Sequence, residues 1–252
     1  MAIRQNTVDL SQRALAQIVS ADVRKAAIMQ RFHLDFSCNG KLTLAEACKD
    51  AHVSLQDVMK SLSSLEQTPI LPSQNLIYWD VDFLCSYIVH THHNYIRESK
   101  RYLPDYAGQV SKNHAKNHPE LLELEVVLER MFSALHNHLQ TEETVLFPAI
   151  GRLFSAWNRE YSQMGPDLKV LISETQLAQL EKEHHEVTGW LNQIRELTDF
   201  YSVPDDACLT YRVYYAKLNE FDDDLALHMH LENNILFPKV EEMCGRFRHF
   251  IA

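Results

Sequence analysis

HLQTEETVLFP at residues 138–148 and HMHLENNILFP at residues 228–238 are two copies of one pattern, HxxxE(E/N)x(V/I)LFP, in a chain of 252 residues. The copies begin 90 residues apart, which indicates two related helical hairpins. In each copy a histidine and a glutamate are spaced i and i+4, so their side chains lie on one face of a helix. The repeat therefore predicts two matched His/Glu pairs in one domain.

Each copy continues an apolar stripe with spacings of three and four residues, as on the buried seam of a bundle helix. The first stripe comprises Leu121, Leu124, Leu128, Met131 and Leu135, followed by His138, Glu142 and Val145. The second comprises Tyr211, Tyr214, Leu218, Phe221 and Leu225, followed by His228, Glu232 and Ile235. Both stripes predict that the histidine and the glutamate point into the core.

Two more segments complete the hairpins. The pair His92-His93 lies about 45 residues before His138, and His184-His185 lies 44 residues before His228. The chain has only 6 glycines and 8 prolines, below their usual shares of about 7% and about 5%. The stretches without a helix breaker are residues 74–103, 120–147, 167–203 (interrupted only by Gly189) and 205–237. We therefore expect an all-α chain whose long helices form a four-helix bundle.

The two glutamates on the seams predict a metal site. Burying an ionised carboxylate in a bundle core costs several kcal/mol unless a cation compensates it. No lysine or arginine lies on either seam nearby. If each carboxylate bridges two ions and two imidazoles bind each ion, every metal has four protein ligands. This donor set is typical of di-iron and di-manganese sites, so we favour iron over manganese, and manganese over zinc.

Spacing identifies the third histidine of this site but not the fourth. His184 continues the stripe of Leu177, Leu180, Val187, Leu191 and Ile194. In the first segment, the stripe of Ile77, Val81, Leu84, Ile88 and Tyr95 favours His92, whereas Val89 and Ile96 favour His93. Spacing alone leaves this choice open. We interpret the remaining histidines, with Glu143 and Glu183, as groups at the surface or behind the ligands.

The first quarter of the chain forms a smaller unit. Residues 1–66 contain a turn at Asn39-Gly40 and a helical pattern from Leu42 to Leu65. Residues 67–73, QTPILPS, carry two prolines, which cannot continue a helix. We therefore predict a small helical N-terminal domain at 1–66, a linker at 67–73 and the bundle at 74–252.

Composition excludes several function classes. The net charge is −10 and the chain has no basic run, which argues against a nucleic-acid or anionic-membrane surface. No apolar stretch approaches the ~20 residues that cross a bilayer. The five cysteines are spread widely and never spaced CxxC, as expected for reduced thiols. The predicted location is the cytoplasm.

Four segments together resemble one known family: THHNYIRE (91–98), HLQTEETVLFP (138–148), EKEHHEVTG (181–189) and HMHLENNILFP (228–238). They are similar to the repair-of-iron-centres family, the ScdA-type hemerythrin-like di-iron proteins. FHLDFSCNGKLTLAEAC (32–48) resembles that family's small N-terminal domain. The likeness implies a hemerythrin-like up-down four-helix bundle with two iron ions per chain, oxo- or hydroxo-bridged.

The resemblance also implies a ligand set. In that family the ligand of the first helix is the second histidine of the THH triplet, here His93. The other ligands correspond to His138, Glu142, His184, His228 and Glu232, with the two glutamates as bridges.

The resemblance implies repair or protection of iron-sulfur clusters damaged by nitric oxide or oxidants, with damaged iron-sulfur proteins as partners. Two mechanisms fit: donation of iron, or chemistry on nitric oxide or peroxide at the metal pair. A homodimer is expected by resemblance. The main alternative is a hemerythrin-like oxygen or iron sensor or carrier. A ferritin-like oxidase fits less well because such bundles rely on more glutamates and on an ExxH spacing, which the repeated HxxxE motif lacks, and a purely structural bundle would leave the buried carboxylates unexplained.

One motif departs from the family. Its N-terminal domain usually carries two adjacent cysteines and two glycines, where this chain has Ser37, Cys38, Asn39 and Gly40. A single thiol remains, so a role that needs two neighbouring thiols is in doubt. Cys38 is either a redox thiol or a turn residue packed beside Phe36.

Overall fold

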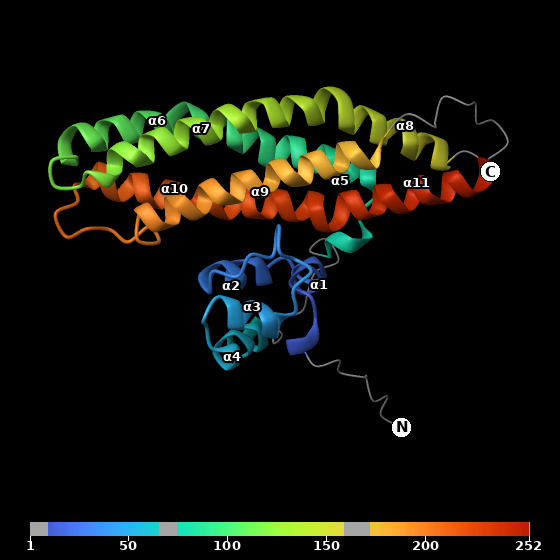
Figure 1. The fold of residues 1–252 in the computed structure, drawn as a ribbon, viewed down its shortest axis with the longest axis horizontal. Helices are drawn as coiled ribbons and strands as arrows, with labels where there is room; N and C mark the ends of the chain where they lie inside the picture. Colours follow the sequence, from blue (N-terminus) through green and yellow to red (C-terminus); the bar gives the residue numbers. More distant parts are fainter. Residues whose placement is uncertain (1–9, 66–74, 159–171, 252) are drawn as a thin grey trace.

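The computed structural model describes residues 10–65, 75–158 and 172–251, and it confirms the all-α fold class. Four long rods run antiparallel, as Figure 1 shows. The first rod is α5 (Val81–Tyr87), η4 (Ile88–His93) and α6 (Asn94–His114), and the second is α7 (Glu120–Thr141), η5 (Glu142–Leu146) and α8 (Phe147–Asn158). The third is α9 (Glu174–Leu197), and the fourth is α10 (Leu209–Leu231), η8 (Glu232–Leu236) and α11 (Phe237–Ile251).

The bundle core consists of two apolar clusters. One cluster fills the space between α6, α7, α9 and α10 and includes Leu128, Leu135 and Leu225. The other lies around α5, α8 and α11 and includes Leu84 and Leu146. The His/Glu positions of the two seams lie between these clusters, so a polar layer interrupts an otherwise apolar interior.

Three rods continue beyond the proline at which the predicted segment ends. Pro104 lies inside α6, and Pro148 and Pro238 lie at the second positions of α8 and α11. The last two prolines follow wide π-helical turns, in which Phe147 N–H donates to the Glu142 carbonyl and Phe237 N–H to the Glu232 carbonyl. Proline lacks an N–H and crowds the carbonyl four residues earlier, so it disrupts regular α-helical bonding. At Pro148 and Pro238 the wide turn just before the proline replaces that bonding, and the helix continues. The rods are therefore longer than the breaker-free segments predicted.

The wide turn in η5 also changes which residue faces the core. The predicted seam ends at Val145, but Val145 is 49% exposed and Leu146 is 4% exposed. A π-helical turn holds one residue more than an α-helical turn, so the buried positions move one residue along the chain. The prediction for Val145 was wrong for this reason.

Within residues 10–65, the small N-terminal unit has its own core and four short α-helices: α1 (Leu15–Ala21), α2 (Lys25–Arg31), α3 (Leu44–Asp50) and α4 (Leu55–Leu65). The helical pattern predicted from Leu42 to Leu65 is split between α3 and α4. α3 begins at a capping box formed by Thr43 and Glu46. The chain turns before α4, where His52 takes a positive φ of 55°, a conformation that a continuous helix does not contain.

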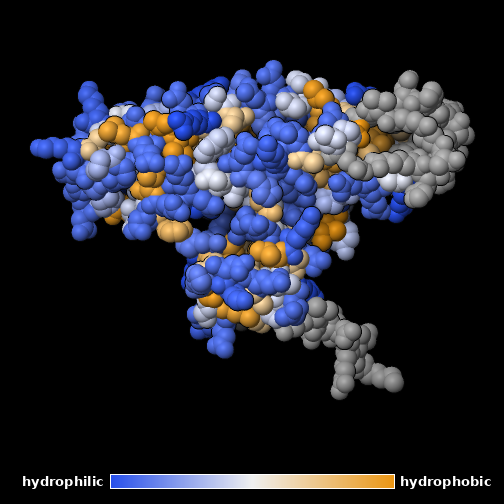
Figure 2. All heavy atoms as spheres, viewed as in Figure 1, coloured by the Kyte–Doolittle hydropathy of each residue, from blue (hydrophilic) through white to orange (hydrophobic). Residues whose placement is uncertain are grey.

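This unit packs against one side of the bundle, close to α9 and α10 (Figure 1). Gln30 donates to the Asp223 carbonyl at 3.0 Å, and Asn234 donates to the Ser37 carbonyl at 2.8 Å. His230 lies in this interface, fully buried, with Nε2 3.2 Å from Ser20 Oγ. Figure 2 shows the unit projecting from the long bundle, with apolar residues along the junction.

The predicted division at residues 1–66, 67–73 and 74–252 is only partly visible. The linker at 67–73 lies outside the described residues, so the boundary stays a prediction. Among the helices that the structure describes, none is long and apolar enough to span a membrane.

Candidate metal centre

The structure brings all six residues named by the family resemblance into one layer of the bundle. They come from η4, the junction of α7 with η5, α9, and the junction of α10 with η8. Each is at most 4% exposed: His93, His138, Glu142, His184, His228 and Glu232. The layer lies between the two apolar clusters, so these polar side chains have almost no contact with water.

The six residues form two overlapping groups. Glu142 and Glu232 belong to both groups, one with His93 and His228, the other with His138 and His184. Within each group, one ligand atom per residue lies within 4.8 Å of the others. The two imidazole pairs have Nε2 atoms 3.2 Å and 2.9 Å apart. Each group can hold one metal ion, with both carboxylates shared.

The orientation of the carboxylates fits this sharing. Glu142 places Oε2 3.3 Å from His93 Nε2 and Oε1 3.1 Å from His138 Nε2. Glu232 places Oε2 3.3 Å from His228 Nε2 and 3.2 Å from His184 Nε2. None of the four oxygens has a hydrogen-bond partner within the described chain. Buried carboxylates facing imidazoles are the donor set that iron accepts, so the residues present fit iron binding.

The electrostatics show how the carboxylates persist in the core. Burial pushes the pKa of Glu232 upward, but His228 and His184 outweigh burial and hold this pKa well below its usual value. Burial and Glu232 likewise raise the pKa of Glu142, while His138 and His93 bring it below its usual value. Both carboxylates are therefore anionic at neutral pH, and the layer attracts cations.

Three of the four histidines have a partner behind the ring. His93 Nδ1 donates to Glu143 Oε1 at 2.7 Å, and His138 Nδ1 donates to Glu183 Oε2 at 2.8 Å. His184 Nδ1 donates to Asn233 Oδ1 at 2.7 Å. Such bonds fix the tautomer that leaves Nε2 free for a metal.

Sequence reasoning missed one of these partners. The sequence analysis assigns Glu143 and Glu183 to the surface or to positions behind the ligands, but it does not identify Asn233. The signal was available, because Asn233 follows Glu232 in one copy of the repeat as Glu143 follows Glu142 in the other.

Comparison with known proteins agrees with this geometry. Residues 86–240 match the family described as Hemerythrin HHE cation binding domain. This chain belongs to that family. Residues 11–66 match a second family, ScdA_N, described as a domain of unknown function. The HHE domain thus corresponds to the bundle, and the ScdA_N match to the small unit.

Curated relatives align over nearly the whole chain. The iron-sulfur cluster repair protein ScdA of Staphylococcus haemolyticus is 28% identical over 232 residues, 91% of this chain and 98% of the relative. A probable iron-sulfur cluster repair protein of Haemophilus influenzae is 28% identical over 235 residues, 92% of this chain and 98% of the relative. The iron-sulfur cluster repair protein YtfE of Yersinia pestis is 29% identical over 232 residues, covering 92% and 98%.

In the HHE domain, the π-helical turn η4 buries both members of the His92-His93 pair. His93 is 0% exposed and His92 is 1% exposed, which is why two stripes competed in the sequence. Only His93 joins a four-residue group. His92 turns instead toward α10, where its Nδ1 lies 2.9 Å from Asp224 Oδ1.

Cys38 lies where the small unit meets the HHE domain. Its Sγ is 3.2 Å from Thr188 Oγ1, and Asn233 donates to it at 3.7 Å. Burial raises the pKa of the Cys38 thiol to about 11, so the thiol is protonated at neutral pH in this arrangement. Asn233 contacts both Cys38 and His184 and so links the small unit to the centre. A redox role for Cys38 stays a prediction.

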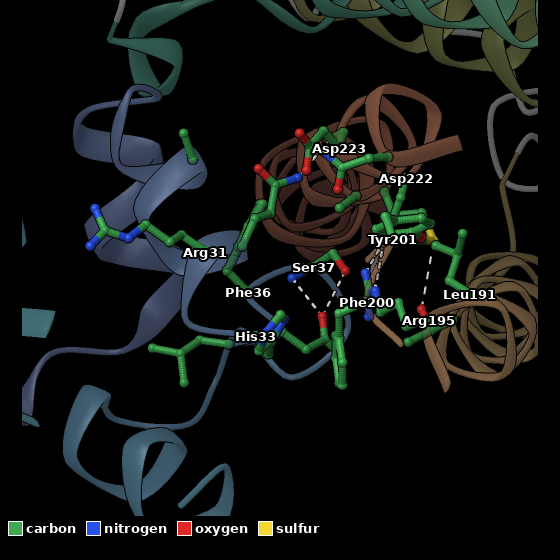
Figure 3. Close-up of a pocket in the computed structure, with 18 residues that line it drawn as sticks. Arg31, His33, Phe36, Ser37, Leu191, Arg195, Phe200, Tyr201, Asp222 and Asp223 are labelled. Atoms are coloured by element: carbon green, nitrogen blue, oxygen red, sulfur yellow. Dashed lines mark hydrogen bonds and ion pairs between the residues drawn. The ribbon is translucent and has the colours of Figure 1, made fainter. Parts of the chain in front are cut away.

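A cavity of about 230 Å³ opens beside this junction. Figure 3 shows the small unit on one side and Arg195, Tyr201 and Asp222 on the other. Arg195 donates twice to Asp222, at 2.7 and 2.6 Å, and Tyr201 OH donates to the same carboxylate at 2.7 Å. These bonds fix the bundle side of the cavity next to the face that the small unit covers.

Proposed function

We propose that this chain binds two iron ions and repairs or protects iron-sulfur clusters damaged by nitrosative and oxidative stress. The relatives named as iron-sulfur cluster repair proteins align over at least nine-tenths of the chain. The bundle and the small unit each match a family of their own. The proposal therefore rests on the whole chain and not on the bundle alone.

The observation that carries the proposal is the sharing of Glu142 and Glu232 by two histidine pairs. Four imidazoles and two bridging carboxylates would give each iron four protein ligands and leave positions for an oxo or hydroxo bridge. Manganese fits the same donors less well than iron in our interpretation.

The four imidazoles and two carboxylates of the centre would hold the ions. Glu143, Glu183 and Asn233 orient three of the imidazole rings. The apolar clusters on either side keep water out. When bound, the iron pair supplies either iron for a damaged cluster or redox chemistry on nitric oxide, dioxygen or peroxide.

The proposed partners follow from this role. They are damaged iron-sulfur proteins and the small molecules nitric oxide, dioxygen and peroxide. We place the protein in the cytoplasm, where iron-sulfur enzymes and reduced cysteines occur; none of the five cysteines, all of which lie in the described residues, forms a disulfide bond. A homodimer belongs to the same proposal.

Iron content tests the metal part. Protein purified from iron-replete cells is expected to contain about two iron ions per chain and to show ferric charge-transfer absorption. His138→Ala removes a ligand and should lower the iron content. His185→Ala is the matched control, because the adjacent His185 is exposed and its Nδ1 bonds to the Glu181 carbonyl one turn earlier in α9. Wild-type protein without iron would overturn the metal site.

Recovery of a damaged enzyme tests the repair part. An iron-sulfur hydratase inactivated by nitric oxide is mixed anaerobically with the iron-loaded chain, and its activity is followed. Recovery with wild type and His185→Ala, but not with His138→Ala, is the expected result. A chain that holds iron and binds dioxygen reversibly without restoring the hydratase would instead be a sensor or carrier.

A further inference from the structure

One of the four histidines of the centre lacks the support that the other three have. His228 Nδ1 has no hydrogen-bond partner within the described chain, although His228 is 0% exposed. If Nε2 binds a metal, Nδ1 carries the ring proton and is a donor. A buried donor without an acceptor costs about 1–3 kcal/mol, so an acceptor is expected close by.

His92 offers the complementary atom. Its Nδ1 lies 2.9 Å from Asp224 Oδ1, and a carboxylate only accepts, so Nδ1 carries the proton of the neutral ring. Nε2 of His92 is then an acceptor, and it too is buried without a partner. The ring centroids of His92 and His228 are 6.1 Å apart. A buried donor and a buried acceptor thus lie on neighbouring rings.

The internal repeat predicts the same pairing. Glu183 precedes His184 in the chain and accepts a hydrogen bond from His138. His92 precedes His93, which is the counterpart of His184 in the other hairpin. His92 therefore occupies the position of Glu183, and the repeat assigns it to His228, the counterpart of His138.

We propose that His92 accepts a hydrogen bond from His228 Nδ1 and is a positioning residue of the metal centre. The inference rests on the proposed function, because it takes His228 as a ligand. His92 orients His228, and Asp224 in turn orients His92. The chain of bonds leads from the buried centre to Asp224, whose side chain is 22% exposed.

The distances allow this bond with a small adjustment. Two imidazole pairs of the centre have Nε2 atoms 3.2 and 2.9 Å apart, and their ring centroids are 5.1 and 4.7 Å apart. The 6.1 Å between His92 and His228 is larger than both. A rotation of one ring, or one water molecule between the two nitrogens, completes the connection.

Iron release tests the proposal. The full chain is loaded anaerobically with Fe(II), a ferrous chelator is added in excess, and release is followed in time. His92→Phe is expected to release one of the two ions about 10–100-fold faster, because support behind a ligand contributes that much to affinity. This ion is the one between His93 and His228, and the ion between His138 and His184 should be released more slowly than this one. Asp224→Ala should act in the same direction to a smaller degree.

A matched pair of variants separates positioning from packing. In His92→Gln the amide oxygen can accept from His228 while the amide nitrogen donates to Asp224, so release should return close to wild type. His90→Phe changes an exposed histidine of the same turn and should change nothing. In the Zn(II)-loaded chain with ¹⁵N-labelled histidine, the His228 Nδ1–H signal should be protected from exchange in wild type and in His92→Gln, and lost in His92→Phe.

The outcomes separate this inference from the proposed function. Wild-type release of both ions by His92→Phe, or fast release by His92→Gln, overturns the role of His92 and leaves the metal site intact. A wild-type chain that holds no iron overturns the metal site and this inference with it.

Discussion

His93 and His138 determine how the metal-free centre responds to acid. Burial lowers the pKa of each ring, but Glu142 and its neighbours raise it more, so the pKa of His93 lies above its usual value and that of His138 well above. For the fully buried His228 burial is the stronger effect, and its pKa is lowered. His93 and His138 therefore keep their protons up to a higher pH than an ordinary histidine does, and a metal ion must compete with those protons.

Iron affinity should consequently fall as the pH is lowered, beginning above the unperturbed histidine pKa of ~6.5. The sign follows from competition, because a raised pKa keeps the proton on the ring up to a higher pH. Each competing proton costs up to about tenfold in affinity per pH unit below that pKa. Titration of metal-free protein with Fe(II) between pH 8 and pH 5 measures this. Affinity that stays constant over the whole range would contradict the four-imidazole site.

At the scale of elements, the π-helical turns set the geometry of the centre. They occur in three of the four rods: η4 ends at His93, η5 begins at Glu142, and η8 begins at Glu232. Each inserts an extra residue beside a candidate ligand. α9 passes through His184 with no such turn in its described length. Wide turns at three ligands allow helices with regular apolar seams to bring bulky polar groups into one layer.

Deleting Val145 should remove the wide turn of η5 and, with it, the metal site. The deletion lets Glu142 and the residues after it return to α-helical spacing, which reorients the carboxylate relative to His138. Helix content by circular dichroism should stay near wild type, whereas iron content should drop. Val145→Ala keeps the chain length and trims only an exposed side chain, so it should bind iron normally. Iron binding by the deletion variant would show that the π-helical turn is dispensable.

The whole molecule depends on how the small unit sits on the bundle. Gly40 lies in the loop that docks onto η8. A Cβ at this position would lie 2.6 Å from Asn234 Oδ1 and 2.8 Å from both Ala16 Cβ and the Phe36 carbonyl. The same loop carries Cys38, so its position also determines the contacts that Cys38 makes with Asn233.

Gly40→Ala should therefore weaken the docking, at a cost of about 1–3 kcal/mol in the free energy of unfolding, because the added methyl group would crowd two side chains and one backbone carbonyl. Gly189→Ala is the matched control. Gly189 lies inside α9 with nothing within 4 Å of an added Cβ, so alanine should stabilise by about 0.5–1 kcal/mol. Chemical denaturation and limited proteolysis near residue 66 measure both. Equal stability of Gly40→Ala and wild type would mean that the loop does not need this close approach.

The sequence predicted much of this molecule, and the misses have physical causes. The repeat predicted the bundle and five of the six converging residues, because a buried carboxylate without a cation is too costly to be accidental. Periodicity assumes 3.6 residues per turn, so it failed at Val145 and could not choose between His92 and His93, where the turn is wider. Asp224 escaped notice because contacts between distant helices leave little trace in local spacing, whereas Asn233 could have been found by aligning the two copies of the repeat.

The burial of the candidate metal centre limits how iron could pass from it to another protein. An ion enclosed by side chains that are at most 4% exposed, between two layers of packed hydrocarbon, offers no face that another protein can touch. It can leave only when neighbouring helices separate transiently, and such local opening is a property of the bundle and not of the recipient protein. If this chain donates iron, the rate at which the bundle opens sets the maximum rate of transfer. Above a certain concentration, more recipient protein no longer increases that rate.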